Sequence, residues 1–135
     1  MKNVETLTAK IFDTAVRVLG LDFPNDAEVS VLLVDKGAMQ ELNERYRGKN
    51  HPTNVLSFET GDKRLVGDIV LCLPVIDEEA YAQGKKSDEH LAHMILHGIL
   101  HLLGYDHERR GDAEKMEEAE VRILKELGIG NPYEE

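Results

Sequence analysis

Apolar side chains recur at every third or fourth position over several segments of the chain, which is the spacing of an amphipathic helix. One such stripe, which Gly20 ends, carries Val4, Leu7, Thr8, Ile11, Ala15, Val18 and Leu19. A second helix, capped by Asp35, has the core stripe Met39, Leu42 and Tyr46. Further helices are predicted over 75–83, over 87–103, and from Asp112 as cap to about Leu127.

Three short segments, 28–34, 55–58 and 65–73, are rich in β-branched and aliphatic residues and predict strands. Pro74 is expected to end the third, because proline cannot donate a ladder hydrogen bond. The sequence has no internal repeat and no linker, so we expect a single domain over 1–135. The predicted fold is α+β, a small mixed β-sheet packed with about five helices.

The segment 87–103 is apolar around most of its circumference, which predicts a buried central helix. Its remaining sector is a stripe of His93, His97 and His101. Burying three imidazoles together is costly unless a partner satisfies them. Ordinary hydrogen bonds in the core are one such partner, and a metal ion is the other.

His97 and His101 stand one helical turn apart, about 6 Å along the axis, so both rings can converge on one ion. His93 cannot easily join them, because three ligands in a row on a straight helix diverge. The sequence offers a third ligand beyond the helix. Gly104 allows the chain to turn, and His107 follows where it can fold back onto the ion.

The resulting spacing, H-x-x-x-H-x-x-G-x-x-H over 97–107, is that of the metzincin proteases. Three imidazoles with an open fourth position are typical of a catalytic zinc site, with one ion per chain. Metzincins place a glutamate directly after the first histidine as general base, and here that residue is Gly98. The pattern therefore predicts a metzincin-like zinc helix and turn in a hydrolase that is not an ordinary protease.

Composition is that of a soluble globular protein, with 41% apolar and 31% charged residues. No apolar run approaches the roughly 18 residues that span a bilayer, so we expect no membrane partner. The chain has one cysteine, Cys72, which can form no internal disulfide and is expected to pack as a small hydrophobe. These features favour a cytoplasmic location.

The formal net charge of −10 argues against a broad electrostatic grip on nucleic acid. The charge is uneven, since the segment 45–58 has Arg45, Arg47 and Lys49 but no acidic residue. Two readings of Arg45 and Lys49 stay open: a local basic patch on an acidic protein, or solvated surface charges.

Several segments together resemble the YbeY family of bacterial endoribonucleases. They are the eleven-residue run 97–107, Tyr46-Arg47-Gly48-Lys49, the segment 52–58 (Pro-Thr-Asn-Val-Leu-Ser-Phe), Gly67-Asp68-Ile69 and Asn131-Pro132-Tyr133. The resemblance implies a single-strand-specific, zinc-dependent endoribonuclease. It would act in ribosomal RNA processing, at the 3′ end of 16S rRNA, and in ribosome quality control. It also implies that His97, His101 and His107 bind zinc and that Arg47 is important for activity.

Phosphodiester cleavage builds negative charge on phosphoryl oxygens, so a guanidinium such as that of Arg47 should stabilise the transition state. The alternative is that Arg47 is an ordinary surface arginine without a role in catalysis. Expected partners are single-stranded or ribosomal RNA and a basic small-subunit ribosomal protein on the ribosome, with no DNA. Two other functions stay open: a metzincin-like zinc peptidase, and a non-catalytic, zinc-stabilised ribosome-binding factor.

Five polar residues are weaker candidates. Ser57 could line the cleft or be an outward strand residue, and Asp106 could orient a ligand or shape the turn before His107. His51 is expected in a loop and His93 in hydrogen bonds within the core. His90 carries no signal beyond its place in the first turn of its helix.

Overall fold

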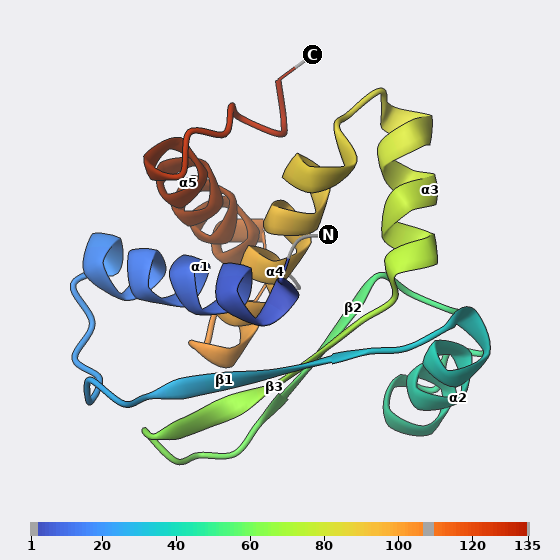
Figure 1. The fold of residues 1–135 in the computed structure, drawn as a ribbon, viewed down its shortest axis with the longest axis horizontal. Coiled ribbons are helices and arrows are strands. Elements are labelled where there is room, and N and C mark those ends of the chain that lie inside the picture. The colour runs from blue at the N-terminus through green and yellow to red at the C-terminus, as the bar shows by residue number, and fades with distance from the viewer. Residues whose placement is uncertain (1–2, 107–109, 135) are drawn as a thin grey trace.

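A mixed sheet lies at the base of the computed structural model, which describes residues 3–106 and 110–134 (Figure 1). Its strands are β1 (Glu28–Leu33), β2 (Val55–Glu59) and β3 (Leu65–Leu71), in the order β1-β3-β2. β1 runs parallel to β3, and β2 pairs with β3 in the antiparallel sense. The predicted small mixed sheet is therefore confirmed.

Five helices accompany this sheet in the described part of the chain. They are α1 (Val4–Leu19), α2 (Lys36–Arg47), α3 (Leu73–Gln83), α4 (Ser87–Leu102) and α5 (Arg110–Glu126). Figure 1 shows α1, α4 and α5 on one side of the sheet, and α2 at the end from which α3 departs. The α+β architecture expected from the sequence is confirmed. None of the described helices is long and apolar enough to cross a bilayer.

The main core surrounds α4, as its nearly continuous apolar surface predicts. Its fully buried side chains come from α1, β3, α4 and α5 and include Ile11, Ile69, Leu71, Ile95, Leu96, Ile99 and Ile123. A smaller cluster of Met39, Leu56, Val70 and Cys72 lies under α2. Cys72 is thus packed as a small hydrophobe, as expected.

The N-terminal caps of two helices follow from short polar side chains. Asn3 Oδ1 accepts a hydrogen bond from Thr6 N at 3.1 Å, and Asp35 Oδ1 accepts one from Ala38 N at 2.8 Å. The prediction for Asp112 is wrong, because α5 already begins at Arg110 and Asp112 lies in its first turn. Its carboxylate still suits that position, where the helix dipole favours negative charge.

Two other expectations from the sequence need correction. β3 ends at Leu71, and Pro74 belongs to the first turn of α3, where its missing N–H is not needed. Tyr46 is 57% exposed and does not join the core stripe of α2, whereas Asn43 is buried. Tyr46 lies in the last turn of α2, where its ring and that of Phe58 pack edge to face with their centroids 5.1 Å apart.

Candidate functional site

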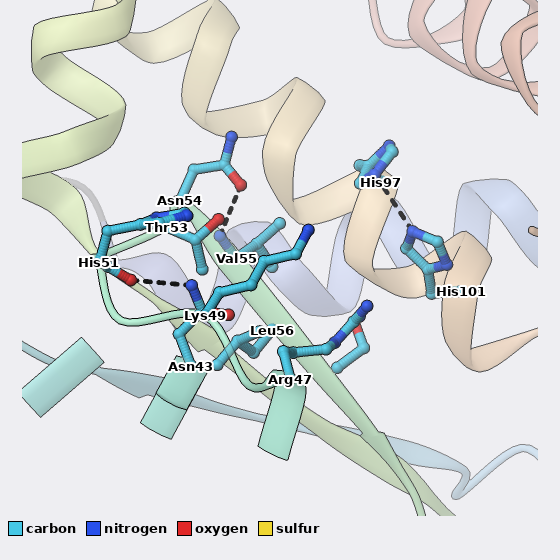
Figure 2. A pocket seen from close by; sticks show the side chains of 11 residues that line it. Asn43, Arg47, Lys49, His51, Thr53, Asn54, Val55, Leu56, His97 and His101 are labelled. Carbon is cyan, nitrogen blue, oxygen red and sulfur yellow. Dashed lines mark hydrogen bonds between the residues drawn. The ribbon is translucent and has the colours of Figure 1, made fainter. Parts of the chain in front are cut away.

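Two histidines of α4 face one another at the surface of the core. The Nε2 atoms of His97 and His101 are 3.2 Å apart, and their ring centroids are separated by 4.7 Å at an interplanar angle of 83° (Figure 2). Their spacing of four residues places both on one side of the helix. The two rings therefore lie together in the structure, whereas their role as metal ligands stays a prediction.

The end of α4 holds His101 in this orientation. Gly104 has a φ of 97°, a conformation that L side chains rarely adopt, and it turns the chain back after Leu103. The returning Tyr105 N–H donates to Leu100 O at 2.9 Å. The carbonyl oxygen of Tyr105 then lies 3.1 Å from His101 Nδ1. Because a carbonyl can only accept a hydrogen bond, Nδ1 must be the donor.

His97 is held by a buried carboxylate that the sequence analysis did not single out. Glu120 of α5 is 1% exposed, and its Oε2 accepts hydrogen bonds from His97 Nδ1 at 3.0 Å and His93 Nε2 at 3.1 Å. Its Oε1 accepts a hydrogen bond from the hydroxyl group of Tyr133. The signal was present in the sequence, because Glu120 lies on the apolar stripe of α5 with Met116, Ala119, Ile123 and Leu124, all buried.

The hydrogen bonds to Glu120 decide its ionisation. Burial alone would raise the pKa of this carboxyl, but the three hydrogen bonds outweigh it and lower the pKa from 4.5 to about 2. Burial, followed by the hydrogen bond to Glu120, raises the pKa of Tyr133. Glu120 is therefore a carboxylate and Tyr133 a neutral donor near pH 7.

The surroundings of the two rings fit a divalent cation. Glu120 and the Tyr105 carbonyl accept hydrogen bonds from the Nδ1–H groups of His97 and His101. In neutral rings the proton then stays on Nδ1, and the two Nε2 atoms present their lone pairs to each other. Tetrahedral zinc with Zn–N distances of about 2.0–2.1 Å requires nitrogens about 3.3–3.4 Å apart, close to the 3.2 Å found here. No cluster of three metal-ligating side chains occurs within 3–106 and 110–134. The predicted third ligand, His107, lies outside the described residues.

A pocket opens beside these histidines, between α4, β2 and the loop after α2 (Figure 2). Arg47 and Lys49 extend into it from the α2 side, facing His97 and His101 across it. The other lining residues are Asn43, His51, Thr53, Asn54, Val55, Leu56 and Ser57. None of the described lining residues is acidic, so the pocket is locally basic on a chain of net charge −10. The structure thus brings Arg47 together with two of the three predicted metal ligands.

The base of the pocket depends on the close approach of α4 to the sheet. A β-carbon at Gly98 would lie 3.0 Å from Val55 Cγ2, 3.1 Å from Ser57 Oγ and 3.2 Å from Ile69 Cγ2. Ser57 Oγ donates to the carbonyl of Gly98 at 2.8 Å. Ser57 therefore lines the cleft, and its hydrogen bond joins β2 to α4.

The remaining weaker candidates are distributed around the site. His51 is a loop residue, as expected, yet it also lines the pocket. His93 hydrogen-bonds in the core, as expected, although its partner Glu120 also holds His97. His90 is buried and pairs with Glu79 Oε1 at 3.0 Å, away from the facing rings. Asp106 is exposed and lines a separate pocket with Gly104 and Tyr105, not the one beside the histidines.

Comparison with known proteins bears on what this pocket does. Residues 1–128 match the family model described as Endoribonuclease YbeY. A relative of that name in Coxiella burnetii is 46% identical over 128 residues, which cover 91% of this chain and 84% of the relative. Another in Aromatoleum aromaticum is 51% identical over 109 residues, covering 80% of this chain and 71% of the relative.

The fold has a solved counterpart as well. A Thermotoga maritima protein, determined in solution, superposes with a TM-score of 0.59 at 26% identity and covers 100% of this chain and 96% of its own. The resemblance first seen in the motifs thus extends over nearly the whole sequence. The chain belongs to the Endoribonuclease YbeY family.

Proposed function

We propose that this chain is a zinc-dependent endoribonuclease that cuts single-stranded RNA at the pocket between α2 and α4. The observation that carries the proposal is the pocket itself, which joins two facing imidazoles to a guanidinium and an ammonium group with no acidic lining residue among those described. A phosphodiester is the substrate class that uses both parts. Family membership independently favours RNA as the substrate.

The proposed metal ligands are His97, His101 and His107, holding one Zn²⁺ and leaving one position for water or substrate. Zinc bound there would supply Lewis-acid stabilisation of phosphoryl oxygens and activation of water or a ribose hydroxyl. The carboxylate of Glu120 and the Tyr105 carbonyl hold the Nδ1 protons and so keep both Nε2 atoms available.

Arg47 is proposed to bind the scissile phosphate. Its planar guanidinium can donate two parallel hydrogen bonds to phosphoryl oxygens, and its charge offsets the negative charge that builds up during cleavage. Lys49 provides a second, more flexible cation on the same wall of the pocket. The backbone of neighbouring nucleotides can bind along this wall without a basic surface over the whole molecule.

We propose ribosomal RNA, at the 3′ end of the small-subunit RNA, as the biological substrate, with a further role in ribosome quality control in the cytoplasm. The acidic remainder of the surface supports this partner. With a net charge of −10, the chain suits docking onto a basic ribosomal protein, which would bring the small basic pocket to the RNA.

The peptidase alternative has less support in the structure. A glutamate at position 98 would have to displace Val55, Ser57 or Ile69, which already crowd the site of its β-carbon. Among the pocket-lining residues that the structure describes there is also no carboxylate to act as general base.

The test is cleavage of matched single-stranded and duplex RNA by the zinc-loaded chain, with His97→Ala as the control. We expect internal cleavage of the single strand only, and loss of that cleavage in the control. Equal cutting by His97→Ala would show that the activity arises elsewhere. Casein hydrolysis that His101→Ala abolishes, without any RNA cleavage, would favour the peptidase.

A further inference from the structure

A buried carboxylate lies directly behind one of the two facing imidazoles, on the side away from the pocket. Glu120 of α5 is 1% exposed and accepts three hydrogen bonds, from two histidines of α4 and from a tyrosine of the C-terminal segment. It therefore joins three parts of the chain that are distant in sequence at a point next to the proposed metal centre.

The network around Glu120 holds more than packing requires. A buried carboxylate needs donors, since an unpaired charge in the core is strongly destabilising. His93 and Tyr133 already provide one donor for each carboxylate oxygen. Their rings pack edge to face with the centroids 5.6 Å apart. The additional donor is His97, whose Nδ1 lies 3.0 Å from Oε2 while its Nε2 faces His101 across 3.2 Å.

We propose that Glu120 is a positioning residue for the metal centre: its carboxylate accepts a hydrogen bond from His97 Nδ1–H and so fixes the tautomer and the direction of the metal-binding Nε2, while Tyr133 holds Glu120 in place. This inference rests on the proposed metal site. A histidine ligand whose second nitrogen donates to a carboxylate is more basic and more rigidly oriented than one that donates to water.

The C-terminal segment is built to deliver Tyr133 to this position. Lys85 Nζ donates to the carbonyl of Pro132 at 2.9 Å, and Tyr133 N donates to Asn131 Oδ1 at 2.8 Å. These contacts bring the Tyr133 hydroxyl within hydrogen-bond reach of the buried carboxylate. The segment thus contributes to the proposed metal centre from behind, without lining the pocket.

The two facing histidines are held by different means, which makes the inference testable. His101 donates to a backbone carbonyl that no side-chain substitution removes, whereas His97 donates to a side chain. A change at position 120 should therefore disturb one ligand and leave the other in place. Glu120→Gln keeps the shape of the side chain but removes its charge and one of its two acceptor oxygens.

The chain also offers a matched control. Glu79 of α3 accepts a hydrogen bond from His90 Nε2 at 3.0 Å, so Glu79→Gln makes the same chemical change to a carboxylate that pairs with another histidine of α4. His90 precedes His97 by seven residues, or about two helical turns, and has no part in the proposed metal site.

The experiment measures the dissociation constant for Zn²⁺ by competition with a chromophoric chelator, and the visible spectrum of the Co²⁺-loaded protein, in all variants. Glu120→Gln should bind Zn²⁺ about 10–100-fold more weakly than the parent and change the Co²⁺ bands, as expected for loss of a carboxylate behind a ligand. Tyr133→Phe should lie between the parent and Glu120→Gln, and Glu79→Gln should match the parent.

A folded Glu120→Gln protein with the parental zinc affinity and Co²⁺ spectrum would overturn the inference, because a merely structural carboxylate changes the unfolding temperature and not the metal site. If Glu120→Gln does not fold, Tyr133→Phe decides, since it removes only a hydroxyl: parental affinity overturns the inference and weaker binding supports it. The proposed function fails separately, and the inference with it, if the parent protein binds no zinc.

Discussion

At the scale of single residues, the proposed metal site depends on which nitrogen of each imidazole carries the proton. Glu120 and the Tyr105 carbonyl accept from the Nδ1 atoms of His97 and His101, and the two Nε2 atoms then meet at 3.2 Å. Histidine spacing predicted the meeting of the rings. It could not predict the acceptors, because Glu120 comes from α5 and the carbonyl depends on the turn at Gly104.

The role of Arg47 can be tested by keeping its charge and changing its shape. Removing a donor that stabilises transition-state charge typically costs about 10²–10³-fold in rate, so Arg47→Ala should slow RNA cleavage by that order. Arg47→Lys should recover only part of this loss, because an ammonium group lacks the planar fork. The readout is the rate of single-turnover cleavage of a single-stranded RNA.

Arg45→Ala is the matched control for this series. Arg45 belongs to the same helix and is exposed, but it does not line the pocket. The Arg45→Ala variant should cut RNA at nearly the parental rate. RNA cleavage by Arg47→Lys at the full parental rate would contradict the bidentate role. If Arg45→Ala lost as much activity as Arg47→Ala, both residues would contribute only through their positive charge and not through a specific contact.

Ionisation of Glu120 predicts a pH dependence of stability in the metal-free protein. Its pKa is about 2 in the folded chain against 4.5 as its ordinary value, so folding favours the carboxylate. The resulting stabilisation is fully present above about pH 4.5 and disappears as pH falls towards 2. The parent should exceed Glu120→Gln in free energy of unfolding near neutral pH, with the gap closing below about pH 4.5.

Urea denaturation of the metal-free parent and of Glu120→Gln at a series of pH values measures this difference in the free energy of unfolding. A gap that stays constant from about pH 6 to about pH 3 would show that folding does not lower the pKa of Glu120.

At the scale of helices and strands, hydrophobic spacing located all five helices and three strands of the described chain, because each element buries a continuous stripe or face. Positions at the ends of elements were less predictable. Tyr46 fits the apolar spacing of α2 but lies in its last turn beside Phe58, and Asp112 has the chemistry of a cap but lies inside α5. Such details depend on tertiary neighbours that a local pattern does not contain.

The packing of α4 against the sheet gives a prediction at this scale. In Gly98→Ala the new β-carbon would lie 3.0–3.2 Å from side-chain atoms of Val55, Ser57 and Ile69, so these side chains must shift to make room for it. Overpacking of this kind typically costs about 1–3 kcal/mol. The free energy of unfolding from urea titration should fall by about that amount.

Gly37→Ala serves as the comparison, because Gly37 is also a helical glycine and its β-carbon would meet Asp35 Oδ1 at an ordinary 3.6 Å. It should leave stability unchanged or raise it by up to about 1 kcal/mol. If Gly98→Ala were as stable as Gly37→Ala, the close approach of α4 would not constrain residue 98.

At the scale of the whole molecule, the metal should matter for activity more than for folding. The core around α4 is large and apolar and draws on α1, β3 and α5, so the fold does not depend on an ion for its packing. Chelation should therefore abolish RNA cleavage while the far-UV circular dichroism stays close to that of the zinc-loaded protein. Loss of the helical signal on chelation would instead favour the zinc-stabilised ribosome-binding factor.

The central claim is that three imidazoles, those of His97, His101 and His107, bind one zinc and leave one position open beside Arg47. The most direct test is X-ray absorption at the zinc edge of the loaded protein. We expect one zinc per chain with three imidazole nitrogens at about 2.0–2.1 Å and one further light atom from water. A site with only two imidazoles, or one closed by a fourth protein ligand, would contradict the account.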